Sequence, residues 1–487
     1  MPDFTNTLPT PVKARMYSHQ IAAFDFACRI FGLLKDVCIS RGVALFYEMG
    51  TGKTLCAIAI CGMLYQMGLI NKILIVAPLS ILGVWKEEFE KFADFPYNLV
   101  VLSGSSEKKK KQLSELPDDA LNVVVINYES TWRVEDALLP FAEGSVIVAD
   151  EGHKIKENRS KQSKAMHRLG DVSEYRLLLT GTPITNKEVD VYSEYRFLNR
   201  NIFGDSFYRF RSRYFDMLGY GNHIPVFREC MRDDFLERLH RIAIRTTKEE
   251  ALDLPETYDE VRYVDLEPKA KALYQQIAKE NYAALGDGEV STPNILTRLL
   301  RLSQITGGFV TDDAQVSTAV STAKLDALSD ILDTAAEENK KIVVIAHYRA
   351  EMDAIEQMLQ KKKIGYAVVR GGVKDRDGEV HRFQNDPDCL CFLGQISAAG
   401  LGITLTAAST MVFYSMNYSS SDFTQAKARI HRVSQRNACQ YIYLICRGTV
   451  DTKVLRSVRD KLDLAKMIVD DYRHGGNPFE DKEDDYE

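Results

Sequence analysis

Short apolar runs rich in β-branched residues recur along this sequence, and segments with a helical spacing of apolar residues separate most of them. One group of runs lies at residues 42–48, 72–78, 121–128, 145–151 and 175–183, and a second at 341–347, 364–372, 389–395, 409–415 and 439–445. Runs that alternate with helices are typical of parallel sheets. The region between the groups, from Lys187 to Glu338, reads mostly helical. We therefore predict an α/β protein with two parallel-sheet lobes and helical insertions.

Composition excludes several classes of protein. Of 487 residues, 45% are hydrophobic and 27% charged, which is typical of a globular protein. The N-terminus lacks the pattern of a secretion signal, and no apolar stretch is long enough to cross a membrane. The net charge of −6 excludes a globally basic nucleic-acid binder, although a local basic groove remains compatible with it. The sequence predicts a protein that is neither secreted nor bound to a membrane.

The cysteine spacing predicts buried thiols and no zinc site. Cys389 and Cys391 are separated by one residue in a strand-like run, so we expect both on the same face of a strand. No second Cys/His pair lies nearby to complete a zinc site.

Residues 46–54, "FYEMGTGKT", have the sequence of a phosphate-binding loop. They follow one apolar run and precede the helical pattern of residues 55–68, which is the strand, loop and helix context that such a loop requires. The N–H groups from Gly50 through Thr51 and Gly52 to Thr54 are predicted to point at a polyphosphate. Lys53 would reach its β and γ phosphates, and Thr54 would ligate magnesium. Tyr47 stands where this motif usually begins with glycine, and an ordinary glycine-rich turn is the alternative.

Two carboxylates follow a later run, in "DEGH" at residues 150–153. Ligands of parallel sheets gather at the carboxyl ends of the strands. We expect Asp150, at the end of a neighbouring strand, to be the partner of magnesium. Glu151 is predicted to orient and deprotonate the attacking water. Taken alone, the four residues could form a solvated turn.

The order of these and further motifs resembles the ATPase motor of the Swi/Snf-like branch of helicase superfamily two. The motifs that carry the resemblance are "YSHQ", "EMGTGKT", "VAPLSILGVWKEEFEKF", "VVINYE", "VADEGHKIKENRSK", "LLLTGTPITN", "AAGLGITLTAA" and "QAKARIHRVSQ". The resemblance implies two RecA-like lobes that bind ATP and Mg²⁺ in the cleft between them and track along double-stranded DNA. It implies a first lobe at residues 1–254 with a helical insertion at about 187–254, and a second at 255–472 with a protrusion and a C-terminal brace helix. Residues 473–487 form an acidic tail that we expect to be disordered.

The resemblance also assigns roles to particular residues. Gln20 would read adenine, Gly402 and Gln425 would contribute to the nucleotide site, and Arg429 and Arg432 would act as arginine fingers. Because the two arginines are three residues apart, we expect them on one face of a helix. A further set would couple the ATP state to DNA: Ser80, His153, Thr180, Gly181, Thr182, Gln395 and Ser397.

Three features need separate interpretation. Ile396 and Ser397 stand where the family usually carries a threonine and an arginine, and isoleucine cannot bind a phosphate, so Gln395 or Ser397 would have to replace that DNA contact. Lys108–Lys111 are predicted to form a solvated loop, with contact to DNA as the alternative. The arginines of residues 208–214, "YRFRSRY", are expected to combine packing with a partial DNA-facing role.

These features predict a DNA-dependent ATPase that translocates along double-stranded DNA and remodels protein–DNA, recombination or replication intermediates. Its partners would be the duplex and a DNA-bound protein displaced by translocation, in the cytoplasm of a bacterial or virus-infected cell or in a nucleus. A strand-separating DNA or RNA helicase is one alternative, although no separation pin is identifiable. A nucleotide-gated DNA-binding scaffold without turnover is the other, and the presence of Lys53, Glu151, Arg429 and Arg432 argues against it.

Overall fold

The computed structural model describes the chain in segments that form two compact units, which part between residues 252 and 253. The boundary predicted from the sequence lies slightly later, between residues 254 and 255. The described residues are 8–34, 37–117, 119–181, 188–218, 224–251, 254–280, 282–285, 288–291, 295–373, 375–395, 403–417, 419–456 and 458–459. None of the helices among them is long and apolar enough to cross a membrane. The acidic tail and most of the predicted brace helix lie outside the described residues, although residues 450–456 are helical.

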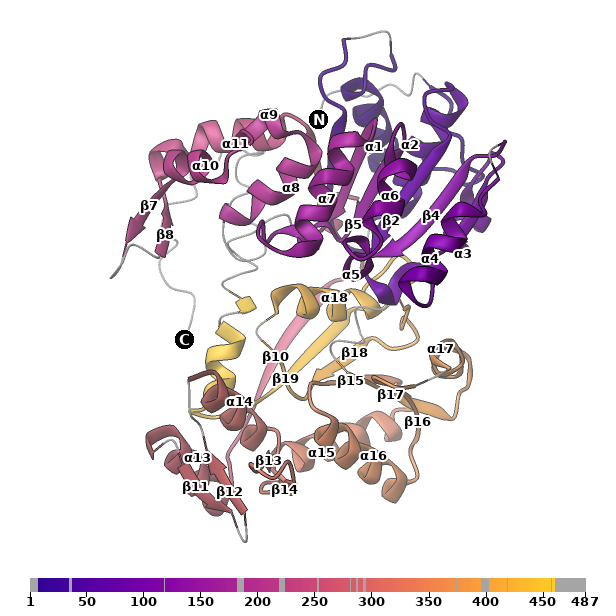
Figure 1. Ribbon diagram of the computed structural model, residues 1–487. Coiled ribbons are helices and arrows are strands. Elements are labelled where there is room, and N and C mark those ends of the chain that lie inside the picture. The colour runs from indigo at the N-terminus through magenta and orange to yellow at the C-terminus, as the bar shows by residue number, and fades with distance from the viewer. Residues whose placement is uncertain are drawn as a thin grey trace. The chain divides into compact units, whose positions relative to one another are not determined.

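The first unit is built on a parallel sheet whose described strands follow the order β3-β4-β2-β5-β6-β1-β9. Its strands are β1 (Gly42–Tyr47), β2 (Lys72–Ala77), β3 (Asn98–Val101), β4 (Asn122–Asn127), β5 (Val146–Asp150), β6 (Tyr175–Thr180) and β9 (Ala243–Thr246). The apolar runs of β1, β4 and β5 are buried at every position, as expected for strands covered on both faces. Figure 1 shows the helices alongside these strands.

The helices of this unit cover the sheet and continue into the insertion. They are α1 (Ser18–Ile30), α2 (Lys53–Gln66), α3 (Leu82–Phe92), α4 (Ser106–Ser114), α5 (Tyr128–Thr131), α6 (Glu135–Ala142), α7 (Lys161–Val172) and α8 (Val191–Leu198), then α9 (Arg200–Phe203), α10 (Phe207–Tyr214), α11 (Arg232–His240) and α12 (Lys248–Ala251). Short 3-10 turns are η1 (Leu79–Ile81), η2 (Gly152–Ile155), η3 (Glu188–Asp190) and η4 (Glu229–Met231), and β7 (Phe215–Leu218) pairs with β8 (Ile224–Phe227).

The second unit has its own parallel sheet, in the order β10-β19-β18-β15-β17-β16 among the described strands. These are β10 (Thr257–Val264), β15 (Ile342–Ala346), β16 (Gly365–Val369), β17 (Cys389–Gln395), β18 (Thr410–Phe413) and β19 (Cys439–Cys446). The helices are α13 (Pro268–Glu280), α14 (Ile295–Thr306), α15 (Ala323–Glu337), α16 (Arg349–Lys362), α17 (Arg376–Asn385) and α18 (Ser420–Ile430). Two small hairpins pair β11 (Tyr282–Leu285) with β12 (Gly288–Ser291) and β13 (Phe309–Thr311) with β14 (Ser317–Ala319). The prediction of two parallel-sheet α/β lobes is confirmed.

The region predicted to be mostly helical also supplies a strand to each large sheet. β9 pairs with β1, and β10 pairs with β19 along its whole length. The exposed positions of β10 carry polar and aromatic side chains, because β10 lies at the edge of its sheet. A strand of this kind lacks the continuous apolar run that marked the others.

Two local predictions are wrong. Cys389 and Cys391 are both buried and reduced, but they belong to different apolar clusters, because a register shift opposite Gly365 and Tyr366 breaks the alternation of β17. Lys108–Lys111 lie in helix α4 and not in a loop; Ser105 caps this helix by accepting a hydrogen bond from the Lys108 N–H.

The arginine-rich stretch of the insertion forms helix α10. Its Phe210 and Tyr214 are buried, whereas Arg209 is exposed and Arg213 donates to Asp234 at 3.0 Å. Packing accounts for the aromatic side chains, and a DNA-facing role of the arginines stays a prediction.

Candidate nucleotide-binding site

The loop between β1 and α2 has the backbone geometry of an anion site. Gly50 and Gly52 have φ angles of 88° and 85°, in the left-handed region that favours glycine. α2 begins at Lys53; among the described residues no side chain caps its N-terminus, and its first turn contains no acidic residue. The N–H groups of the first turn are therefore available to an anion, and the helix dipole favours negative charge there.

Helix α1 holds this loop from one side. His19 Nε2 lies 2.9 Å and Gln20 Nε2 3.1 Å from the carbonyl oxygen of Thr51. A carbonyl can only accept, so His19 carries its proton on Nε2. Burial lowers the pKa of His19, although its hydrogen bond to Thr51 opposes the shift, which favours the neutral ring. Tyr47 completes the arrangement by donating to the His19 carbonyl at 2.6 Å.

Both ends of the Gln20 amide are engaged, one by the start of α1 and the other by the loop. Its Oε1 accepts the Tyr17 N–H at 2.9 Å, while its Nε2 donates to Thr51. Its predicted contact with adenine stays a prediction, and reading a base would require one of these bonds to be shared or exchanged. The supporting role of His19 was missed at the level of sequence, although His19 stands directly before Gln20.

Asp150 ends β5 inside the protein. Trp85 Nε1 donates to Asp150 Oδ2 at 3.0 Å, the Glu151 N–H donates to Oδ1 at 2.9 Å, and Tyr128 donates to the Asp150 carbonyl at 2.8 Å. Burial raises the pKa of Asp150 to about 7, the charge of Glu151 adds to this, and Lys53 opposes it. A cation bound beside this carboxylate would favour its charged form.

Trp85 contacts a predicted site residue, Asp150, and sequence reasoning did not single it out. It lies on α3, and its side chain is only 2% exposed. The signal available in the sequence was a tryptophan in one of the motifs that carry the family resemblance.

Glu151 occupies a strained backbone position at the turn after β5. Its φ of 51° is in the left-handed region, which costs a residue other than glycine of the order of 1–3 kcal/mol. The next residue must be small, since a Cβ on Gly152 would overlap the side chain of Leu178. His153 Nδ1 lies 3.4 Å from Glu151 Oε2, and both side chains are largely buried. The backbone of this turn therefore determines the direction of the Glu151 side chain and places the His153 ring beside it.

Strand β6 lies between the loop and the carboxylates. The prediction that Asp150 ends a strand next to the loop strand is wrong, because β6 pairs with both β1 and β5. Lys53 still acts electrostatically on Asp150, and its Nζ donates to the Tyr47 carbonyl at 2.8 Å. Alternate strands of a sheet lie only about 10 Å apart, a gap that a lysine side chain and a bound phosphate can bridge.

The coupling residues predicted for the first unit are partly described. Thr180 is buried at the end of β6, and Gly181 passes so close to the β1 backbone that a Cβ there would lie 3.3 Å from the Tyr47 carbonyl oxygen. Thr182 and the side chain of Ser80 lie outside the described residues.

The donor set fits a magnesium nucleotide. Lys53 and the uncapped N-terminus of α2 match the phosphates, while the partly buried Thr54 hydroxyl and the Asp150 carboxylate are oxygen ligands of the type Mg²⁺ prefers. Among the described residues no cluster of three or more His, Cys, Asp or Glu side chains could hold a metal ion, so this chemistry depends on a few protein oxygens and on the phosphates themselves.

The arginine motif of the second unit is arranged differently from the prediction. α18 ends at Ile430, and His431 has φ −102° and ψ 85°, so Arg429 lies in the last helical turn and Arg432 beyond it. The two arginines therefore do not share a helix face. Arg432 folds back, donating through Nε to the Ala428 carbonyl at 3.0 Å and through Nη1 to Thr404 at 2.8 Å.

The other residues predicted for the second unit are buried, bonded to the backbone or outside the described residues. Gln425 and Arg429 are buried. Gln395 Nε2 donates to the His347 carbonyl at 3.2 Å, and its Oε1 accepts the Gly371 N–H at 3.3 Å. Ser397 and Gly402 lie outside the described residues.

A phosphate-loop turn and an acidic pair at the carboxyl edge of one parallel sheet define a nucleotide-binding α/β protein, and comparison with known proteins narrows this class. The model of the SNF2-related domain matches residues 30–307, and that of the helicase conserved C-terminal domain matches residues 323–434. The chain belongs to the SNF2-related family, and its two domains are those of a helicase-family ATPase.

Individual relatives are distant. The CHD3-type chromatin-remodeling factor PICKLE of Arabidopsis thaliana is 27% identical over 470 residues, covering 88% of this chain and 33% of its own. The chromodomain-helicase-DNA-binding protein 1-like of Mus musculus is 28% identical over 475 residues, covering 94% and 50%. The chain thus spans between a third and a half of the length of these relatives. A solved structure titled Sulfolobus solfataricus SWI2/SNF2 ATPase core in complex with dsDNA covers 96% of this chain and 95% of its own, with 26% identity and a TM-score of 0.46.

Proposed function

We propose that this protein is an ATP-driven translocase on double-stranded DNA that remodels protein–DNA, recombination or replication intermediates. The observation that carries the ATPase half of the proposal is the convergence of Lys53 with Asp150 and Glu151 at one edge of the first sheet. Membership of the SNF2-related family supports the proposal of an ATP-driven motor. The names of the two relatives associate those proteins with chromatin remodeling and DNA binding.

In this proposal, different residues of the first unit bind the phosphates of ATP, hold Mg²⁺ and activate water. The loop N–H groups and Lys53 bind the phosphates, while Thr54 and Asp150 would hold Mg²⁺, which when bound neutralises phosphate charge. Glu151 orients the attacking water and accepts its proton, and the His153 ring lies beside the glutamate side chain. Trp85 fixes the orientation of the Asp150 carboxylate.

The second unit supplies positive charge to the same reaction. Arg429 and Arg432 would stabilise the negative charge on the transferring phosphoryl group, a contribution typically worth about 10³ to 10⁵ in rate. Because these residues belong to a different unit from Lys53, hydrolysis would depend on both units.

The DNA half of the proposal rests on how a moving enzyme must bind. A motor that tracks along a duplex contacts mainly phosphates, since base edges change at every step. Its affinity for DNA should therefore fall steeply as salt rises. The net charge of −6 requires the cationic contact surface to be local.

One paired experiment tests this function. We expect duplex DNA to stimulate ATPase more than single strands or RNA, and we expect the protein to displace a triplex-forming third strand while leaving a plain forked duplex paired. Both displacement reactions are measured in one buffer, with Lys53→Ala as the control that cannot use ATP. Efficient fork unwinding without triplex displacement would favour a helicase, and DNA binding without stimulated turnover would favour a scaffold.

A further inference from the structure

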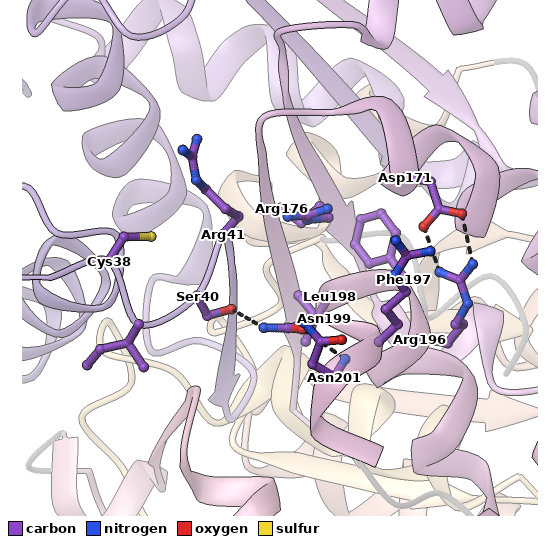
Figure 2. A pocket seen from close by; sticks show the side chains of 12 residues that line it. Cys38, Ser40, Arg41, Asp171, Arg176, Arg196, Phe197, Leu198, Asn199 and Asn201 are labelled. Atoms are coloured by element: carbon purple, nitrogen blue, oxygen red, sulfur yellow. Dashed lines mark hydrogen bonds and ion pairs between the residues drawn. The ribbon is translucent and has the colours of Figure 1, made fainter. Parts of the chain in front are cut away.

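A cavity of about 320 Å³ lies at the amino ends of β1 and β6, at the opposite edge of the first sheet from the phosphate loop. Four arginines line it, together with Asp171: Arg41, Arg176, Arg196 and Arg200. They come from the segment that enters β1, from the start of β6 and from the junction of α8 with α9. Figure 2 shows this cavity with Arg176 among the lining side chains.

Two of the four guanidinium groups already have carboxylate partners. Arg196 forms two hydrogen bonds with Asp171, each of 2.8 Å, and Arg41 pairs with Glu174 (Figure 2 shows the first pair). Burial alone would raise the pKa of Asp171, but Arg196, with Arg200 adding to it, holds that pKa below its usual value. Asp171 is therefore a charged carboxylate that is already engaged.

The other two guanidinium groups lack a carboxylate partner within the described chain. Arg176 donates through Nη1 to the Gly170 carbonyl at 2.7 Å, and its buried Nε has no hydrogen-bond acceptor among the described residues. Arg200 is exposed, and it acts electrostatically on Asp171, whose carboxylate is already bonded to Arg196. Burial lowers the pKa of Arg176 to about 10, Asp171 opposes the shift, and Arg41, Arg196 and Arg200 add to it. Arg176 remains charged near neutral pH in a crowded group of cations.

Hydrogen bonds connect the polar residues that line the cavity. Asn199 donates to Ser40 Oγ at 3.0 Å and accepts the Asn201 N–H at 3.0 Å, while Ser40 donates to the Gly42 carbonyl at 2.9 Å. Gly42 lies directly opposite Arg176 in the sheet. The position of Arg176 is thus fixed by the backbone of two paired strands, and little reorganisation would accompany binding.

We infer that this cavity binds a phosphate dianion, either free inorganic phosphate or the terminal phosphate monoester of a nucleic-acid strand. A tetrahedral dianion balances the two unmatched cations, accepts several N–H donors at once and suits guanidinium geometry. The diester groups inside a nucleic-acid strand carry one charge each and are flanked by sugars, so they fit a recessed Arg176 less well. The cavity and the nucleotide site are separated by the length of β1, which for its six residues is about 20 Å.

Cys38 provides a local probe, because it lines the cavity and is exposed. Cys230 is the other exposed cysteine among the described residues. For the labelling experiment we therefore substitute it, Cys230→Ser, so that maleimide reports on Cys38. We expect inorganic phosphate to slow maleimide labelling of Cys38 several-fold relative to sodium chloride of equal ionic strength. Arg176→Gln should abolish this protection, and the exposed Arg200→Gln should weaken it without affecting folding.

Two matched variants separate the cavity from other phosphate-binding surfaces. Lys53→Ala removes the main side chain of the nucleotide site, and Arg209→Gln removes an exposed arginine of the same unit, so both should keep the protection. Loss of protection in Lys53→Ala, or equal protection in the parent protein and in both cavity variants, would overturn the inference. An oligonucleotide with a 5′ phosphate that protects better than its unphosphorylated counterpart would identify the strand terminus as the source. Protection by inorganic phosphate alone would identify the free anion.

Discussion

At the scale of single residues, buried side chains hold the proposed phosphate loop and the proposed magnesium ligand in place. The His19 ring fixes the Thr51 carbonyl in the phosphate loop, and the Trp85 indole fixes the Asp150 carboxylate. Each uses one N–H donor of a buried ring; a hydrogen bond to a neutral carbonyl is typically worth about 0.5–1.5 kcal/mol, and one to a charged carboxylate about 1.5–3 kcal/mol. Local geometry of this kind decides how well a site is organised before any ligand binds.

Lys53→Ala and Glu151→Gln should have separable effects. Removing the ammonium group should impair nucleotide binding, whereas the carboxamide should bind ATP but lower duplex-stimulated turnover by about 10²-fold or more, because it cannot accept a proton. Binding is measured with a fluorescent ATP analogue and turnover by phosphate release. Glu157→Gln, at an exposed position of the same loop region, is the control. Parent-level turnover by Glu151→Gln would remove Glu151 from the mechanism.

Trp85→Phe should change the response to magnesium. Phenylalanine keeps most of the buried ring but removes the N–H that binds Asp150 Oδ2. Outer partners of metal ligands are typically worth about 10- to 100-fold in metal affinity, so half-maximal ATPase should need about tenfold more Mg²⁺, and excess Mg²⁺ should restore turnover. Trp132→Phe is the control. If the variant has an unchanged Mg²⁺ requirement, Trp85 serves packing alone.

At the scale of elements, the two glycines that flank helix α2 have similar backbone conformations but different surroundings. Gly52 precedes the helix and Gly68 follows it, with φ angles of 85° and 70°. A Cβ on Gly52 would overlap the Gln20 amide, whereas a Cβ on Gly68 would meet nothing within 4 Å. Gly52 and Gly68 thus share a left-handed backbone conformation. At Gly52 this conformation belongs to the predicted nucleotide site, whereas at Gly68 it only allows the chain to turn after the helix.

Gly52→Ala and Gly68→Ala form a matched pair. Gly68→Ala should lower the free energy of unfolding by about 1–2 kcal/mol, the cost of a left-handed residue with a side chain, and Gly52→Ala by more, because its Cβ also overlaps the Gln20 amide. Gly52→Ala should in addition weaken ATP binding at least tenfold, because it displaces Gln20 from Thr51. Denaturant unfolding and nucleotide titration measure the two effects. Equal ATP affinity in both variants would contradict the role given to Gln20.

At the scale of the whole molecule, the proposed reaction uses residues from two units. The phosphate loop, Asp150 and Glu151 belong to the first, and Arg429 and Arg432 belong to the second. Each unit has its own buried core and its own parallel sheet. The dependence of hydrolysis on the second unit can therefore be tested by changes that leave the first unit intact.

Arg432→Ala should retain ATP binding and lose duplex-stimulated hydrolysis by about 10³-fold, if its charge acts on the phosphoryl group. Arg436→Ala, an exposed arginine in the same segment, should behave like the parent protein. Thr404→Val removes the hydroxyl that accepts from Arg432 and shows how much of the loss comes from positioning. Stimulated hydrolysis at the parent rate in Arg432→Ala would exclude it as an arginine finger.

The sequence by itself determined the two groups of buried strands, the glycine-rich turn before α2 and the acidic pair at the end of β5. These features depend on local signals: continuous apolar runs mark strands buried on both faces, and glycine marks left-handed backbone. The resemblance of the motifs added the family, which the matches to the SNF2-related and helicase C-terminal domain models confirm.

The tertiary structure alone decided which of these residues meet. Trp85 and Asp150 are 65 positions apart, and no local pattern predicts their hydrogen bond. The position of β6 between β1 and β5, the edge strand β10 and the register shift in β17 all arise from strand pairing, which is settled by packing across the sheet. The same holds for the arginine cavity, whose residues are scattered along the chain and are brought together where β1 and β6 begin. Local propensity specifies an element, but only the packed fold specifies its neighbours.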